Sequence, residues 1–157
     1  MEIVKNVGTY FGSTEFFDGV LSAKAKIPFT QGEANLFVKV LSAIEEQCKK
    51  EGIQKADLGE ANVIISDDGS YAFEIGIDDE NTYGYYMKNI IYPMNKLREK
   101  DNPVFTMIVF TEELAHFVWP RLREQQIKYK IIEILQPIIP EVNEKLLEAF
   151  GISMEDY

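Results

Sequence analysis

A strongly apolar segment between Pro103 and Trp119, with the sequence PVFTMIVFTEELAHFVW, predicts a central helix. Asp101 or Asn102 can cap this helix, and Pro103 suits the first turn, where a backbone N–H has no helical partner. At about 100° per residue, apolar side chains fall on both sides of the helix. A helix of this kind belongs inside a domain, so we expect residues 103–119 to be buried.

Alternation of apolar and polar residues predicts a strand at residues 71–77, and the segments beside the turn signals add candidate strands at residues 9–17, 20–27, 62–66 and 88–96. Asp18-Gly19 lies between the first two segments and predicts the turn of a hairpin. Residues 67–70, with the sequence DDGS, join the next two segments into a second predicted hairpin. These residues lack the later acidic positions of a calcium-binding EF-hand loop, so we interpret them as a plain turn.

Three more helices are predicted from apolar residues at helical spacing. A capping box, Thr30 to Glu33, opens the first of them, which runs to about Lys50 and stops at Gly52. The other two are expected at residues 122–135 and 140–150, and the tail at 152–157 is expected to fray. The order of elements predicts one α+β domain over residues 1–157, with a small, mainly antiparallel sheet and helices packed on one face.

Composition restricts the classes of function. The net charge of −10 argues against nucleic-acid binding, which needs a basic surface. Cys48 is the single cysteine, which excludes an internal disulfide and a cysteine zinc cluster, and we expect it to be a small core residue. The first residues lack the apolar run of a secretory signal, and no stretch reaches the length of a membrane span, so we expect a cytoplasmic protein without membrane contact.

Tyr83, Tyr85 and Tyr86 form an aromatic cluster in a polar segment. Aromatic side chains on such a loop can line a groove for a peptide or protein partner, or they can cover a small core. The oligomeric state is left open by the sequence.

Glu112, Glu113 and His116, the only histidine, lie together in the second half of the central helix. Glu112 and His116 are one helical turn apart and project side by side. Buried charges are costly unless they are paired or bound to a metal, which makes this cluster the candidate functional site. The spacing Glu-Glu-x-x-His matches the zinc-hydrolase motif His-Glu-x-x-His with glutamate in place of the first histidine.

The segment resembles the active-site helix of the zincin metallopeptidases, and the order of elements over about residues 30–135 is similar to that of a minimal zincin domain. The resemblance implies a zinc ion held by Glu112, His116 and a third ligand from the following helix, with Glu124 and Glu133 as the candidates. It also implies that Glu113 is the general base that activates a metal-bound water.

The replacement of histidine by Glu112 leads to two expectations. A site with two carboxylates and one imidazole is harder than a usual zinc site, so manganese and iron are alternatives to zinc. The chain is then either a catalytically degenerate zincin that serves as a binding or regulatory protein, or an active metal-dependent peptidase. In the degenerate case no metal need be bound, and Arg121, Arg123 or a lysine neutralises the carboxylate that is not paired with His116.

Two further interpretations of the same residues stay open. Glu113-x-x-His116 also matches half of a di-iron carboxylate site, which one histidine per chain could complete only across a dimer. Alternatively, His116 is an ordinary core histidine oriented by Glu112.

Overall fold

The computed structural model describes residues 11–72, 80–81, 83–84 and 86–155. Its sheet contains three strands in the order β1 (Leu21–Ala25), β2 (Ala61–Ser66) and β3 (Asn89–Pro93). Both strand pairs are parallel, with Leu21 opposite Ala61 and Asn62 opposite Asn89 at their starts. The chain therefore mixes helices and strands, as predicted, but the expected antiparallel arrangement is wrong for the described sheet.

The first predicted hairpin is absent from the described residues because its turn signal belongs to a different structure. Gly19 does adopt a positive φ of 78°, as the Asp-Gly pair suggests. However, it lies in a compact turn in which the N–H of Phe17 bonds Thr14 O and the N–H of Val20 bonds Phe17 O. After β1, the long helix α1 (Gln31–Glu51) carries the chain back, so that β2 runs in the same direction as β1.

The second predicted hairpin is correct only in its first strand. Residues 62–66 form most of β2, whereas Tyr71 and Ala72 are not in a strand. The rest of the predicted partner, residues 73–77, lies outside the described residues. The strand predicted at residues 88–96 is confirmed over Asn89–Pro93, which form β3, but its last three residues belong to α2 (Met94–Lys100).

The predicted helices are confirmed, except that the last of them, expected at residues 140–150, begins only at Glu144. Thr30 and Glu33 form the capping box of α1, and Gly52 ends that helix in the left-handed conformation. Asn102 Oδ1 accepts the N–H groups of Val104 and Phe105 at the start of α3 (Pro103–Val118). The remaining elements are the short η1 (Lys55–Asp57), α4 (Glu124–Leu135) and α5 (Glu144–Ala149).

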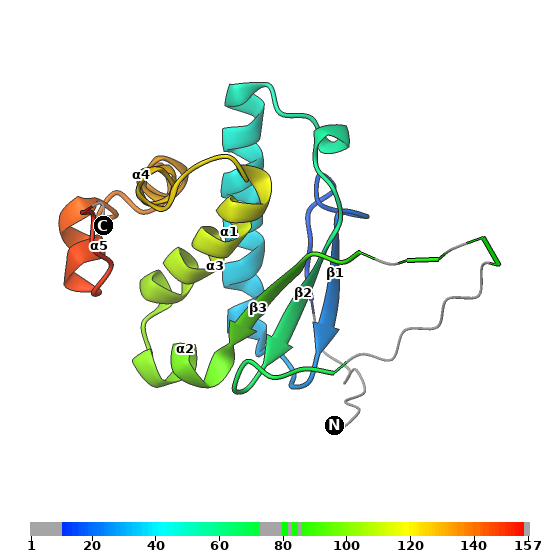
Figure 1. Ribbon diagram of the computed structural model, residues 1–157. Helices are drawn as coiled ribbons and strands as arrows, with labels where there is room; N and C mark the ends of the chain where they lie inside the picture. The colour runs from blue at the N-terminus through cyan, green and yellow to red at the C-terminus, as the bar shows by residue number, and fades with distance from the viewer. Residues whose placement is uncertain (1–10, 73–79, 82, 85, 156–157) are drawn as a thin grey trace.

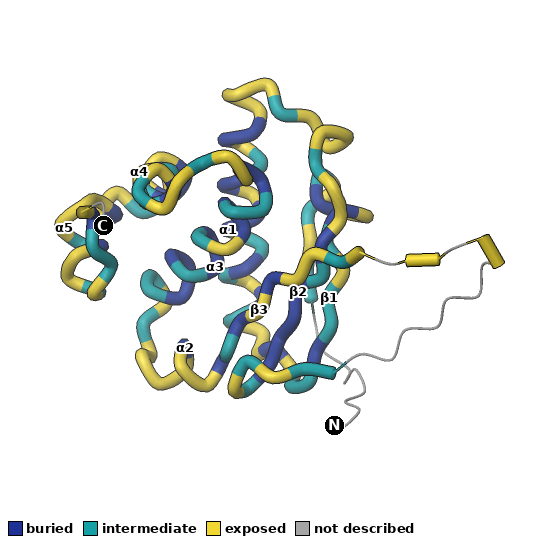
Figure 2. The backbone as a smooth tube through the Cα atoms, viewed as in Figure 1, coloured by how far each residue is buried: buried dark blue, intermediate teal, exposed yellow. Residues whose placement is uncertain are grey.

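The helices lie on one side of the sheet, as predicted, with α3 in contact with α1, α2, α4 and β3 (Figure 1). Buried residues concentrate in α1, α3 and β2 (Figure 2). Tyr92 of β3 is fully buried and donates its hydroxyl to Phe110 O of α3 at 2.8 Å, which joins the sheet to the central helix. Cys48 is completely buried in the core, as expected, and burial raises the pKa of its thiol to about 11, so it is not a nucleophile.

Two peripheral regions complete the fold. Residues 152–155 of the tail have contacts that a frayed segment would lack, because Met154 is buried, Gln125 Nε2 donates to Met154 O at 3.1 Å and Lys128 donates to Ser153 O. The last two residues, 156–157, lie outside the described residues. Tyr83 and Tyr86 are exposed, so neither covers a core. None of the helices within the described ranges has the length and apolar character needed to cross a membrane.

Candidate metal centre

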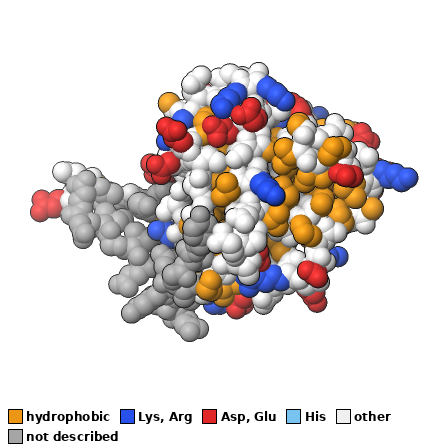
Figure 3. Space-filling model, turned by 180° about the vertical axis from the view of Figure 1, so that it is seen from behind, with side chains coloured by type: hydrophobic (Ala, Val, Ile, Leu, Met, Phe, Trp, Pro, Cys, Tyr) orange, Lys and Arg blue, Asp and Glu red, His pale blue; other side chains and the backbone are white. Residues whose placement is uncertain are grey.

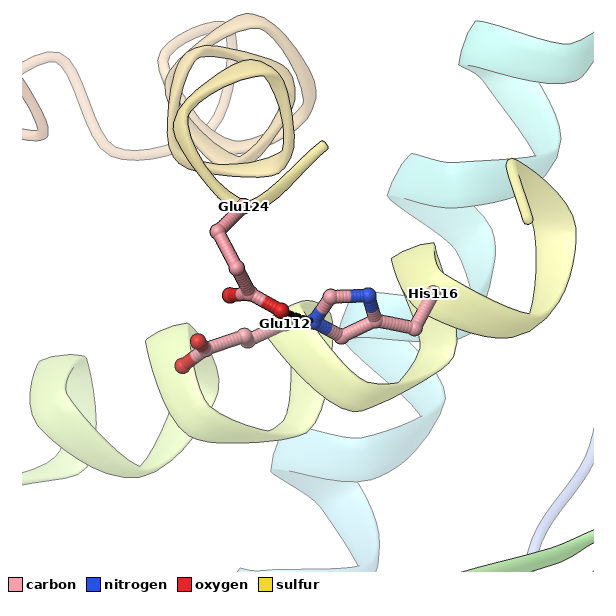
Figure 4. A group of neighbouring side chains, drawn as sticks. All are labelled: Glu112, His116 and Glu124. Atoms are coloured by element: carbon pink, nitrogen blue, oxygen red, sulfur yellow. Dashed lines mark ion pairs between the residues drawn. The ribbon is translucent and has the colours of Figure 1, made fainter. Parts of the chain in front are cut away.

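Two helices and the turn between them position the candidate ligands. Pro120, which has no N–H to donate, follows the end of α3, and the N–H of Leu122 bonds Trp119 O at 3.1 Å within a tight connection. The chain changes direction there, so Glu124, the first residue of α4, lies beside His116 in the last turn of α3. Figure 4 shows the side chain of Glu124 reaching down from α4 toward His116 and Glu112 on α3.

The structure brings Glu112, His116 and Glu124 together, as the sequence predicts for the ligands. One ligand atom from each residue lies within 4.8 Å of the others. His116 Nε2 and Glu124 Oε1 are 3.4 Å apart, with side chains 33% and 70% exposed. Two ligands of a tetrahedral zinc ion, each about 2.1 Å from the metal, are also about 3.4 Å apart. The His116–Glu124 pair therefore has the separation of two zinc ligands, and Glu112 offers an oxygen within 4.8 Å of both in a cluster that is accessible from solvent.

The electrostatic environment of Glu112 favours a cation. Burial raises the pKa of this carboxyl, and the nearby charges of Glu113 and Glu124 raise it further. His116 and Lys128 act in the opposite direction without cancelling these effects. The ionised form of Glu112 is thus underneutralised by its own chain, and a bound cation would stabilise it.

Glu133, the alternative third ligand, lies outside the cluster. Its carboxylate accepts a hydrogen bond from Gln47 of α1 and lies 3.5 Å from Lys130 Nζ. It lies more than two turns along α4 from Glu124, and its carboxylate contacts α1 instead of Glu112 and His116. Of the two candidates that the sequence left open, Glu124 is therefore the one that lies near Glu112 and His116.

Glu113, the predicted general base, is exposed and is not a member of the three-residue cluster. Its charge contributes to the raised pKa of Glu112 and, after burial, to the strongly raised pKa of the Tyr92 phenol. Glu113 therefore lies near the ligands but on the side of α3 that is close to β3.

Lys128 is the charged neighbour that sequence reasoning left unnamed. It lies one turn after Glu124 on α4, and its ammonium group acts on Glu112 while it donates to Ser153 O of the tail. The same i, i+4 spacing that links Glu112 and His116 could have pointed to it. Among the main influences on the pKa of Glu112, the basic side chains are His116 and Lys128, and both favour its ionised form.

A second polar cluster fixes α4 against α1 and the end of α3. Lys130 Nζ lies 3.0 Å from Glu51 Oε2 and 5.1 Å from the centre of the Trp119 ring. Trp119 Nε1 donates to Glu51 Oε1 at 3.2 Å. This α1–α3–α4 clamp, formed by Glu51, Trp119, Lys130 and Glu133, flanks the connection that places Glu124 next to His116.

Comparison with known proteins does not identify the chain: no family model, no curated protein and no solved structure matches it.

Proposed function

We propose that this protein binds one divalent transition-metal ion through Glu112, His116 and Glu124, and that it acts as a zincin-like binding or regulatory protein with a catalytically degenerate site. The observation that carries the proposal is the convergence of these three ligands from two helices within 4.8 Å. Zinc is the expected ion, since it accepts mixed nitrogen and oxygen ligands in compact sites, with manganese and iron as alternatives.

The charges of the ligand set support a divalent ion. Two ionised carboxylates and a neutral imidazole carry a charge of about −2, which a divalent cation balances. Without a metal, His116 and Lys128 are the groups that favour the ionised form of Glu112, and they do not outweigh burial and the neighbouring acids. Solvent can complete the coordination, because Glu124 lies on the surface.

A binding role is favoured over hydrolysis by two features. Glu113 is exposed and outside the ligand cluster, whereas a general base must reach the metal-bound water. Two carboxylate ligands also leave more negative charge on the metal, which makes its bound water a weaker acid. The alternative is a metal-dependent peptidase that uses Glu113 as its general base. The zinc-loaded wild type and the Glu113→Gln variant described below also test this alternative.

The test is a metal titration of the chelator-treated full chain, measured by calorimetry and by competition with a chromophoric chelator. We expect one zinc ion per chain, and cobalt substitution should give the visible absorption of a four- or five-coordinate site. His116→Ala and Glu124→Gln should each weaken zinc binding by about 100-fold or more, because each removes a direct ligand. Glu113→Gln is the matched control, and it should change the affinity less than fivefold.

Two outcomes contradict the proposal. If the wild-type chain binds no metal at micromolar concentrations, or if the ligand variants bind as tightly as Glu113→Gln, the cluster is not a metal site. If the zinc-loaded chain cleaves a casein-derived peptide mixture, and Glu113→Gln abolishes cleavage while it retains zinc, the protein is the hydrolase instead.

A further inference from the structure

A groove runs along α1 where this helix lies beside α3 and the end of α4. Its main part has a volume of about 480 Å³ and a second hollow of about 170 Å³ adjoins it, sharing Ala43, Glu46 and Ile138. We call the two together the α1 groove. It is lined by α1 over residues 38–50, by Met107 of α3 and by the segment at 133–139.

The floor of the α1 groove is apolar. Its apolar side chains are Val38, Ala43, Met107, Ile134, Ile138 and Ile139. Ile138 is 49% exposed, which is unusual for an isoleucine at the centre of a hollow. The view from behind shows hydrophobic side chains gathered on the helical side of the molecule (Figure 3). A surface of this kind is typical of a contact site for another molecule.

The rim of the α1 groove carries acids that are paired within the chain and lysines that are not. The two acids are neutralised by their own chain, since Glu46 pairs with Lys49 at 3.2 Å and Glu133 pairs with Lys130 at 3.5 Å. Lys39 and Lys50, by contrast, have no ion pair or hydrogen bond from their side chains within residues 11–72, 80–81, 83–84 and 86–155. The groove therefore offers two unpaired positive charges beside an apolar floor, although the chain as a whole has a net charge of −10.

The spacing of these charges matches a helix. Lys39 and Lys50 lie on α1, eleven residues apart, which corresponds to about 16 Å and three helical turns. The wall that carries them is a helix whose backbone groups bond internally, so an extended strand would leave its own N–H and C=O groups unpaired there. A helix satisfies its backbone internally and can place an apolar stripe on the floor.

We propose that the α1 groove binds an amphipathic helix of a partner protein, with an apolar stripe at i, i+3, i+4 and i+7 and with acidic residues about three turns apart that pair with Lys39 and Lys50. Apolar contact supplies most of the affinity, and the two lysines set the register and select against basic helices. The net negative charge of the chain does not prevent this, because at physiological salt charges beyond about 8 Å are largely screened.

The test uses synthetic 18-residue amphipathic peptides with leucine on the apolar stripe and alanine and glutamine elsewhere. One peptide carries glutamate at two positions eleven residues apart, and its twin carries lysine there. Binding is followed by fluorescence anisotropy, and the contact surface is mapped by NMR chemical-shift changes. We expect the glutamate peptide to bind about tenfold tighter than its twin, with shifts centred on residues 38–50 and 138.

Variants locate the site and the source of the preference. Ile138→Asp should remove binding of both peptides, because it places a charge on the apolar floor. The double variant Lys39→Glu, Lys50→Glu should reverse the preference in favour of the lysine peptide. Lys145→Glu, the same change on exposed α5, is the matched control and should leave both affinities unchanged. Thermal unfolding of each variant verifies that it is folded.

Three results overturn the inference: equal affinity for the two peptides, shifts that map elsewhere, or sedimentation showing that the wild-type chain dimerises while Ile138→Asp is monomeric. The last result assigns the groove to a second copy of the chain. All measurements are made in chelator, so they are independent of the metal proposal.

Discussion

The two polar clusters on α4 differ in how their charges are balanced. At the middle of the helix, Lys130 lies between Glu51 and Glu133 and over Trp119, so the clamp contains its own cation. At the start of the helix, Glu124 joins Glu112 and His116 in a cluster whose acids outweigh the cations near them. A cluster that is neutralised internally holds the fold together, whereas one that lacks a cation is suited to bind one from solution.

The largest expected effect comes from making the metal cluster a better zinc site. Glu112→His should tighten zinc binding by about 100-fold, because an imidazole is a softer and better zinc ligand than a carboxylate. Competition with a chromophoric chelator measures the change. Glu99→His adds a histidine on exposed α2, away from the cluster, and should leave zinc affinity unchanged. Equal affinity of Glu112→His and the wild type would remove the support for a zincin-like arrangement.

A substitution in the clamp should lower the stability of the fold and leave metal binding unchanged. Lys130→Met removes a side chain that is only 12% exposed, and leaves Glu51 and Glu133 without their shared cation. We expect the free energy of unfolding in urea to fall by about 2 kcal/mol, reduced from the value for a deeply buried pair because both acids are partly solvated. Lys145→Met, on the surface of α5, is the control. A loss below about 0.5 kcal/mol would show that the clamp is not a structural cluster.

The two clusters also show which features could be predicted from local sequence. The i, i+4 spacing of Glu112 and His116 is a property of one helix, and Glu124 was one of two candidate ligands expected from the following helix. The clamp joins residues from three helices, so no spacing within one segment of the sequence predicts it. Long-range contacts of this kind depend on how the helices pack.

The sheet illustrates the same limit. The segments that form β1, β2 and β3 were predicted as strands from the local sequence around them, including the Asp-Gly and DDGS turn signals. Strand direction is not local. Asp18-Gly19 indicated a turn correctly, but the reversal it suggested is replaced by α1, whose length allows β1 and β2 to be parallel.

A smaller change in zinc affinity is expected from Lys128, which lies next to the metal cluster. The positive charge of Lys128 favours ionised Glu112 but also repels an incoming metal ion. Lys128→Met should therefore tighten zinc binding about threefold at low salt, and the gain should shrink at high salt as screening increases. Calorimetry at two ionic strengths measures this. Weaker zinc binding in the variant would mean that Lys128 supports the site instead of opposing the metal.

The smallest effect, and the one that compares the clusters most directly, is the pH dependence of stability without metal. Burial raises the pKa of Glu112, so the folded chain binds the carboxyl proton more tightly than the unfolded chain. The stability that this proton provides is lost as the pH rises from the unfolded-state pKa through the higher pKa of the folded state.

The pKa of Glu51 is shifted in the opposite direction to that of Glu112, so its effect on stability has the opposite dependence on pH. Burial alone would raise its pKa, but hydrogen bonds from Gln47 and Lys130 outweigh burial and lower it, so its stabilisation is present at neutral pH and is lost as pH falls below about 4.5. Glu112→Gln should then be more stable than the wild type at pH 7 and nearly equal at pH 4, whereas Glu51→Gln should be less stable at pH 7 and approach the wild type at pH 3. Urea unfolding in chelator at these pH values measures both differences. If the two variants shift stability in the same direction at pH 7, the contrast between an underneutralised cluster and a self-neutralised one is wrong.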